Sequence, residues 1–148
     1  MVEAEQLYRT LARQAPDSIY APRATLNIGR IYELSDYYQD VTDLAKARAV
    51  YEQVLATWSN QPVASEATLR IAATYIKTHR EADVRRGVAI LNTWLAAHPS
   101  NAFASTMWQY LGNTYFYPLR DYTNCVACLL KADDIGLTLR SGAGATYW

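Results

Sequence analysis

The sequence has little cysteine, glycine and phenylalanine, and it has no excess charge of either sign. Its 148 residues include two Cys, six Gly and two Phe, while 14 Lys and Arg residues balance 14 Asp and Glu residues. Two cysteines cannot supply a disulfide framework for a fold of this size. A net charge of zero gives no general electrostatic reason to bind nucleic acid or an anionic membrane, because both attract an excess of Lys and Arg. We therefore expect no nucleic-acid partner.

Long apolar runs are also absent. Charged residues interrupt every apolar stretch within a few positions, so we expect no segment that spans a membrane. The first ten residues, MVEAEQLYRT, begin with acids and lack the basic and apolar regions of a signal peptide.

Hydrophobic residues nevertheless make up 51% of the chain and charged residues 19%, which excludes an intrinsically disordered protein. Twelve Tyr and four Trp residues suit closely packed helices that also present a polar face to water. No segment alternates apolar and polar residues as a half-buried strand would. The sequence therefore predicts an all-α fold.

An internal repeat is the strongest signal in the sequence. Residues 24–32, ATLNIGRIY, share five of nine positions with residues 67–75, ATLRIAATY, and residues 108–115, WQYLGNTY, keep the same ending. Each copy ends in an apolar residue, a small residue, two further residues and Tyr. The small residues are Gly29, Ala72 and Gly112.

Each copy is followed by a second helical pattern, in which a bulky residue lies four positions after a small one. Spacings of three and four place each set on one helix face, where small residues let two helices approach closely. The sets are Ala47, Tyr51 and Val54; Gly87, Leu91 and Trp94; Cys125, Leu129 and Ala132; and an earlier, unpaired set of Ala4, Tyr8 and Leu11.

Turn and capping residues agree with this division. Pro16-Asp17-Ser18 and Pro99-Ser100-Asn101 are typical of a helix end followed by a cap, and Asp43, Asp83 and Asp121 stand where second helices should begin. About seven helices and a partial eighth are predicted. Their expected spans are 2–15, 18–35, 43–58, 62–79, 84–97, 101–117, 121–135 and a short piece near 142–148.

With these residues in place, the sequence resembles a tetratricopeptide repeat array. Residues 108–115 match the first half of that family's signature, Trp, two residues, Leu-Gly, two residues and Tyr, at every fixed position. Thr25 and Thr68 replace the Trp in the other copies, and the spacings of 43 and 40 residues exceed the usual period. The resemblance implies a right-handed α-solenoid of antiparallel helix pairs in one domain, residues 1–148. Its parts are a half repeat (1–17), repeats 18–60, 61–100 and 101–138, and a partial repeat (139–148).

The resemblance is to bacterial arrays of large scaffolds and envelope proteins. It implies a scaffold that binds another protein or a peptide, and it leaves the compartment open. The cytoplasm fits the sequence, as do the cell envelope and the extracellular space if a leader was removed.

Both ends of the predicted array lack a polar capping repeat. The first helix has the pattern of a second helix, and Thr146-Tyr147-Trp148 resembles Thr106-Met107-Trp108. One interpretation is a fragment of a longer array. The other is head-to-tail self-assembly into a filament or ring, in which two copies complete a split repeat. The expected end contacts are Tyr8, Leu11, Tyr147 and Trp148.

In this family the first helices line a concave groove, so the resemblance implies a set of groove residues. They are Arg23, Asn27 and Arg30 in the first copy, Glu66, Arg70 and Lys77 in the second, and Gln109, Asn113 and Tyr117 in the third. Such a face suits an extended peptide that offers carboxylates or backbone carbonyls. The family's clamp for C-terminal chaperone peptides is not expected, because Leu26 and Arg30 occupy two of its Lys and Asn positions.

Catalytic and metal-binding patterns are weak. Cys125 and Cys128 have the spacing of half a metal or redox site, but no second pair completes it, and Cys125 stands at a packing position. His79 and His98 lie at expected helix ends outside any recognisable motif. The glycine-rich residues 141–145 follow a helix and lack a Lys, so we interpret them as a connection rather than a phosphate loop. We expect neither enzymatic activity, nor a cofactor, nor a bound metal.

Overall fold

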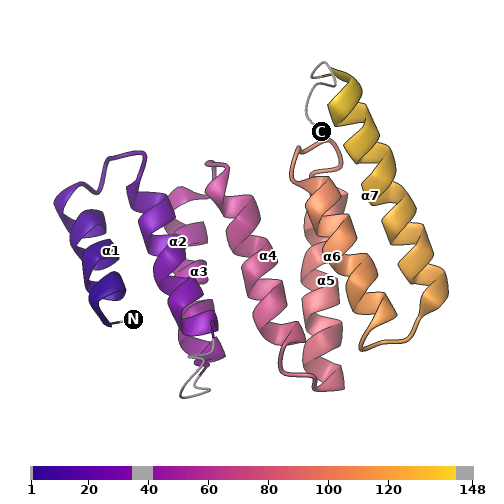
Figure 1. Cartoon of the computed structure of the whole chain (residues 1–148), viewed down its shortest axis with the longest axis horizontal. Coiled ribbons are helices and arrows are strands. Elements are labelled where there is room, and N and C mark those ends of the chain that lie inside the picture. Colours follow the sequence, from indigo (N-terminus) through magenta and orange to yellow (C-terminus); the bar gives the residue numbers. More distant parts are fainter. Residues whose placement is uncertain (1, 35–41, 143–148) are drawn as a thin grey trace. The chain divides into compact units, whose positions relative to one another are not determined.

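The protein is all-helical. The computed structural model describes residues 2–34 and 42–142, with side chains up to residue 136, and these residues form α-helices and no strand (Figure 1). This confirms the predicted all-α class, while the solenoid of antiparallel pairs stays a prediction. The helices are α1 (Val2–Gln14), α2 (Ala21–Glu33), α3 (Leu44–Trp58), α4 (Val63–Ile76), α5 (Glu81–Ala97), α6 (Ala104–Phe116) and α7 (Tyr122–Gly142). Within the described ranges, none of them has the length and apolar character needed to cross a membrane.

The chain divides into two compact units. The N-terminal unit, Met1–Thr78, contains α1 to α4, and the C-terminal unit, His79–Trp148, contains α5 to α7. The boundary falls inside the predicted repeat 61–100. The pairing of α4 with α5 in one repeat, and the single domain over residues 1–148, therefore stay predictions.

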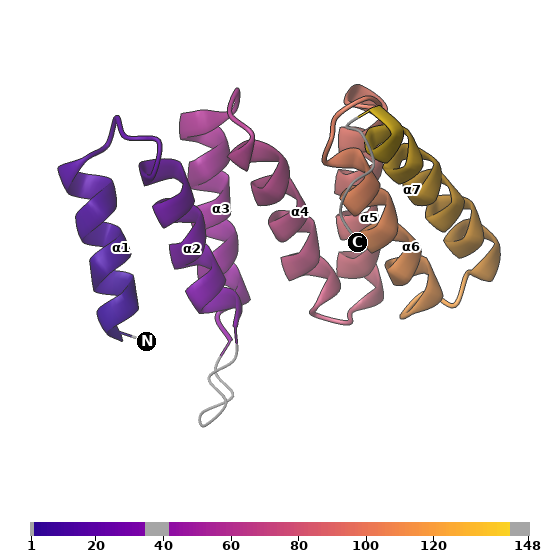
Figure 2. The ribbon, with the colours of Figure 1, turned by 45° about the horizontal axis from the view of Figure 1, so that its top comes forward.

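In the N-terminal unit, helices that follow one another in the sequence pack side by side (Figures 1 and 2). Helix α2 packs on α1 and α3, α3 packs on α4, and α2 also reaches α4. The predicted stripe of α3 is fully buried at Ala47, Tyr51 and Val54. Ile28 and Ile71, the apolar residues before the small position of each copy, are also buried, as the repeat pattern predicts.

In the C-terminal unit, α6 packs extensively on α7 and also contacts α5. Leu91 of α5, with Met107 and Leu111 of α6, is almost completely buried. Cys125 and Cys128 are buried on α7 as well, which fits the packing role expected for Cys125. Leu129 lies against Gly112, although 38% of its surface remains exposed.

Side-chain caps define several helix starts. The Asp43 carboxylate accepts a hydrogen bond from the Lys46 backbone N–H (2.9 Å), and Asp121 accepts one from the Asn124 N–H (3.0 Å). These bonds satisfy N–H groups that have no partner within the helix. Asp83 differs, because α5 begins earlier, at Glu81, and places Asp83 within its first turn.

Five predicted boundaries are wrong by three residues or more, namely the starts of α2, α5 and α6 and the ends of α4 and α7. Helices α2 and α6 begin three residues later than expected, because the residues after Ser18 and Asn101 form turns. Helix α7 continues to Gly142, past its predicted end at residue 135 and into the stretch interpreted as a connection. A single Gly136 costs about 1 kcal/mol in a helix, and the residues that follow include no proline to end it. The rest of the predicted piece at 142–148 lies outside the described residues.

Candidate functional site

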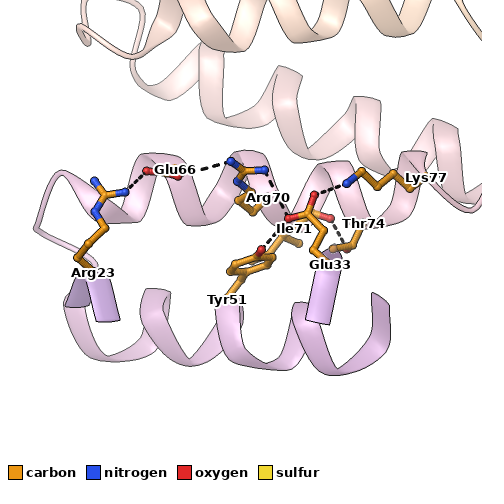
Figure 3. A network of polar contacts seen from close by, with 8 residues as sticks. All are labelled: Arg23, Glu33, Tyr51, Glu66, Arg70, Ile71, Thr74 and Lys77. Carbon is orange, nitrogen blue, oxygen red and sulfur yellow. Dashed lines mark hydrogen bonds and ion pairs between the residues drawn. The ribbon is translucent and has the colours of Figure 1, made fainter. Parts of the chain in front are cut away.

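Four of the predicted groove residues come together in one polar network in the N-terminal unit. Arg23 extends from α2, Glu66 and Arg70 from α4, and Lys77 from the residue that follows α4 (Figure 3). The network connects these side chains with two residues outside the predicted set, Glu33 and Tyr51.

Glu33, the last residue of α2, is the centre of the network. Only 2% of its side chain is exposed, and Tyr51, Arg70 and Lys77 point toward it (Figure 3). The Tyr51 hydroxyl donates a hydrogen bond to Oε2 (2.6 Å), and Lys77 Nζ donates one to Oε1 (2.5 Å). Arg70 Nη1 lies 3.5 Å from Oε2. Three helical segments thus meet at one buried carboxylate.

The position of Tyr51 depends on the small residue that the repeat places on α2. Its ring lies against Gly29, which has no side chain to push it away. Glu33 lies four residues after Gly29, one turn further along the same helix face. The Tyr51 hydroxyl can therefore extend past Gly29 and reach the Glu33 carboxylate.

Burial and hydrogen bonding act in opposite directions on the Glu33 carboxyl. Burial, the largest single cause, would raise the pKa of Glu33, but the hydrogen bonds from Lys77 and Tyr51 and the charges of Lys77 and Arg70 together outweigh it, and the pKa lies below its ordinary value. Burial is the larger cause, and the hydrogen bond that the Tyr51 hydroxyl donates to the Glu33 carboxylate is the second. Both raise the pKa of Tyr51 far above its ordinary value. At neutral pH the pair is therefore a carboxylate and a neutral phenol.

Ion pairs extend the network toward the start of α2. Arg70 Nη2 lies 3.7 Å from Glu66 Oε1, and Arg23 pairs with the other oxygen of Glu66. The Nε atom of Arg70 is buried and has no hydrogen-bond partner in the described part of the chain. A buried donor without a partner is uncommon and costs free energy.

The remaining first-copy residues lie beside this network. Asn27 is half-buried and Arg30 is exposed, both on α2. Arg30 makes no ion pair with any residue that the structure describes, although its charge is close enough to Tyr51 to lower the pKa of that hydroxyl slightly against the larger opposing effects.

The third-copy residues belong to the C-terminal unit and take no part in the network. Gln109, Asn113 and Tyr117 are all exposed, and the Tyr117 ring centre lies 6.3 Å from that of His79. Gln109 also lines a shallow, open hollow of about 220 Å³ between α6 and α7. Its other lining residues are Ser105, Leu129, Ala132, Asp133 and Gly136.

Two of the expected end contacts, Tyr8 and Leu11, lie on α1. Tyr8 is half-buried on α1, while Leu11 is 37% exposed and its neighbour Leu7 is 71% exposed. Tyr147 and Trp148 lie outside the described residues.

Sequence reasoning missed Glu33 and assigned Tyr51 to packing alone. A signal for Glu33 was present, because the position four residues after the small residue is apolar in the other copies, Ile76 and Phe116. A lone carboxylate at a position that is otherwise apolar indicates a buried charge, which requires partners. Tyr51, aligned on the packing stripe, is one of them.

Metal-ligating side chains are not clustered in the part of the chain that the structure describes. The described residues contain no cluster of three or more His, Cys, Asp or Glu side chains that could hold a metal ion. Burial raises the pKa of the Cys128 thiol, which disfavours the reactive thiolate.

Comparison of the chain with protein-family models, with curated proteins and with solved structures finds no match.

Proposed function

We propose that this protein is a protein-interaction module of the tetratricopeptide kind, built as a right-handed solenoid of antiparallel helix pairs. Its partner binds on the face where α2 and α4 lie together. The convergence of Arg23, Glu66, Arg70 and Lys77 on this face carries the proposal. The resemblance to tetratricopeptide arrays implies these residues as groove positions.

The organisation of the face supports binding rather than a purely solvated surface. Long charged side chains on a helix surface ordinarily lose rotamer freedom only when they gain defined contacts. Here the buried Glu33 carboxylate, which accepts a hydrogen bond from Tyr51, pairs with Arg70 and Lys77, so that part of this side-chain entropy is already lost in the free protein. A preorganised surface of this kind binds with a smaller entropic cost.

Photo-crosslinking tests the proposal. A diazirine side chain replaces Asn27, which is on the proposed face, or Gln53, which is exposed on α3. After irradiation in an extract of the source cells, we expect a discrete adduct with one protein from position 27 alone. The purified protein identified in this adduct should then bind the unmodified chain in solution. Absence of an adduct, or equal labelling from both positions, would reject the α2–α4 face as an interaction site.

The alternative function is self-assembly, in which copies complete split repeats head to tail. The observation that favours it is apolar exposure on both terminal helices, Leu7 on α1 (71%) and Leu130 on α7 (65%). Sedimentation velocity over a hundredfold range of concentration distinguishes the two functions. Self-assembly predicts a mass that rises with concentration and a Leu7→Lys variant that stays monomeric, whereas a constant mass would exclude it.

A further inference from the structure

We infer that the cationic face, consisting of Arg23, Arg30, Arg70 and Lys77, binds an acidic segment of the partner protein through that segment's carboxylates. This inference rests on the proposed function and names the partner's chemistry.

The first observation is the layering of charge in the network. The two carboxylates lie deep, with 2% of the Glu33 side chain and 18% of the Glu66 side chain exposed. The cations lie above them, with 31% of Arg70, 43% of Lys77 and 55% of Arg23 exposed. A molecule that approaches this face therefore meets ammonium and guanidinium groups rather than carboxylates.

The second observation is an excess of positive charge. Among the described residues of the network and its neighbour Arg30, four cations stand against two carboxylates, an excess of two. Glu33 accepts close hydrogen bonds from Tyr51 and Lys77, whereas Arg70 Nη1 stays 3.5 Å from its Oε2, longer than a charge-assisted hydrogen bond. Arg30 has no carboxylate partner in the described part of the chain. The carboxylates of this face thus have hydrogen-bond or ion-pair partners, whereas its cations keep N–H donors that are not used.

The third observation is the donor geometry. A guanidinium carries five N–H donors and binds a carboxylate through two parallel hydrogen bonds. Arg23 and Arg30 are seven residues apart on α2, whereas the charged groups of Arg70 and Lys77 converge on the single carboxylate of Glu33. Seven residues of helix rise about 10 Å. An extended segment covers that distance in about three residues, so two of its carboxylates can pair with cations on one helix.

The test uses a fluorescently labelled peptide of eight glutamates as the probe and an eight-glutamine peptide as its neutral counterpart. Fluorescence anisotropy gives the Kd at low salt and at higher salt. We expect the glutamate peptide to bind, the glutamine peptide to bind at least tenfold more weakly, and added salt to weaken binding, because exposed charges are screened.

Variants assign the binding to the cationic face. Arg30→Gln removes an exposed cation that holds no described ion pair, so the fold should be retained. Loss of one charge-assisted contact should raise the Kd about tenfold. Arg70→Gln should have at least as large an effect, with circular dichroism confirming that the helices persist. Arg85→Gln, at an exposed Arg that pairs with Glu81 on α5, is the matched control and should leave the Kd unchanged.

Each contrary result has a defined meaning. Absence of glutamate-peptide binding at millimolar concentration, or equal weakening by Arg30→Gln and Arg85→Gln, would overturn the inference. Equal binding of an oligouridylate would also overturn it, because the face would then attract polyanions of any kind. If the crosslink from position 27 persisted in these cases, the proposed function would stand and only the acidic partner would be rejected. If the crosslink failed as well, both the proposed function and the acidic partner would be rejected.

Discussion

Gly29 of α2 lies directly against the buried ring of Tyr51 on α3. A Cβ atom at Gly29 would come within 2.8 Å of Cδ1 and 2.9 Å of Cζ of that ring, closer than carbon atoms normally approach. Tyr51 is fully buried and hydrogen-bonded to Glu33, so a shift of its ring would strain that bond and disturb the core. The small residue of the first copy therefore sets the separation of α2 and α3.

We predict that Gly29→Ala destabilises the protein despite the better helix propensity of alanine. Overpacking a filled core costs about 1–3 kcal/mol, while replacing a helical glycine by alanine returns about 0.5–1 kcal/mol. The net loss should appear as a lower free energy of unfolding in urea titrations.

Gly136→Ala is the control for this substitution. Among the side chains that the structure describes, a Cβ at Gly136 would meet Ser105 Oγ alone, at an ordinary 3.6 Å. This variant should gain stability, by about 0.5–1 kcal/mol. A Gly29→Ala variant as stable as the wild type would show that the two helices can separate at no cost.

The seven helices of the described residues and most core positions could be predicted from the sequence, because both depend on periodicity. The stripe of Ala47, Tyr51 and Val54 is buried as expected, since spacings of three and four select one helix face whatever packs on it. The end of α7 could not be found in this way. A glycine-rich stretch indicates a weaker helix, but it does not by itself end one.

The candidate site could be predicted only in part, because the position of a residue within its helix does not give its tertiary contacts. Register places Arg23, Glu66, Arg70 and Lys77 on first-helix faces, but it does not tell which of them meet. Their convergence depends on Glu33, whose burial follows from the packing of α2, α3 and α4. A contact among three helices is a tertiary property that no single helical pattern contains.

The pH dependence of stability should report on Glu33. The pKa of Glu33 is lower in the folded protein than in the unfolded chain. The stability that ionised Glu33 contributes is therefore fully present above its unfolded pKa, and it is lost as the pH falls through its folded pKa. We expect the stability difference between the wild type and Glu33→Gln to be largest at neutral pH and to shrink below about pH 4. Urea unfolding followed by tryptophan fluorescence, at several pH values from 7 to 3, measures this difference.

Tyr51→Phe provides the comparison for that experiment. It keeps the carboxylate and the Lys77 contact but removes one of the hydrogen bonds that lower the pKa of Glu33. Its acid-dependent loss of stability should therefore be smaller than that of the wild type. A stability difference between the wild type and Glu33→Gln that stayed constant down to pH 3 would show that Glu33 is not held as a carboxylate by this network.

Cys125 and Cys128 should be unreactive in the folded protein. Both are buried on α7, and burial raises the pKa of Cys128, so little thiolate is available to a reagent. We expect slow labelling by a disulfide-exchange reagent at pH 7.5 and fast labelling of two thiols in urea. Val126→Cys places a thiol between them at a position that is 57% exposed and should react rapidly in the folded state. Native labelling of Cys125 or Cys128 at the rate of this added thiol would contradict the packing role.

Arg120, immediately before the Asp121 cap of α7, holds a left-handed backbone conformation with a φ of 55°. For a residue with a Cβ atom, this conformation costs about 1–2 kcal/mol of conformational free energy, whereas glycine adopts it freely. Arg120→Gly should therefore raise the free energy of unfolding, by up to about 1 kcal/mol after the greater flexibility of glycine in the unfolded chain is subtracted. Arg120→Ala removes the same charged side chain but retains the Cβ atom, so it separates backbone strain from charge. Thermal unfolding should rank the glycine variant above the alanine variant, and the reverse order would mean that the connection into α7 does not require a left-handed residue.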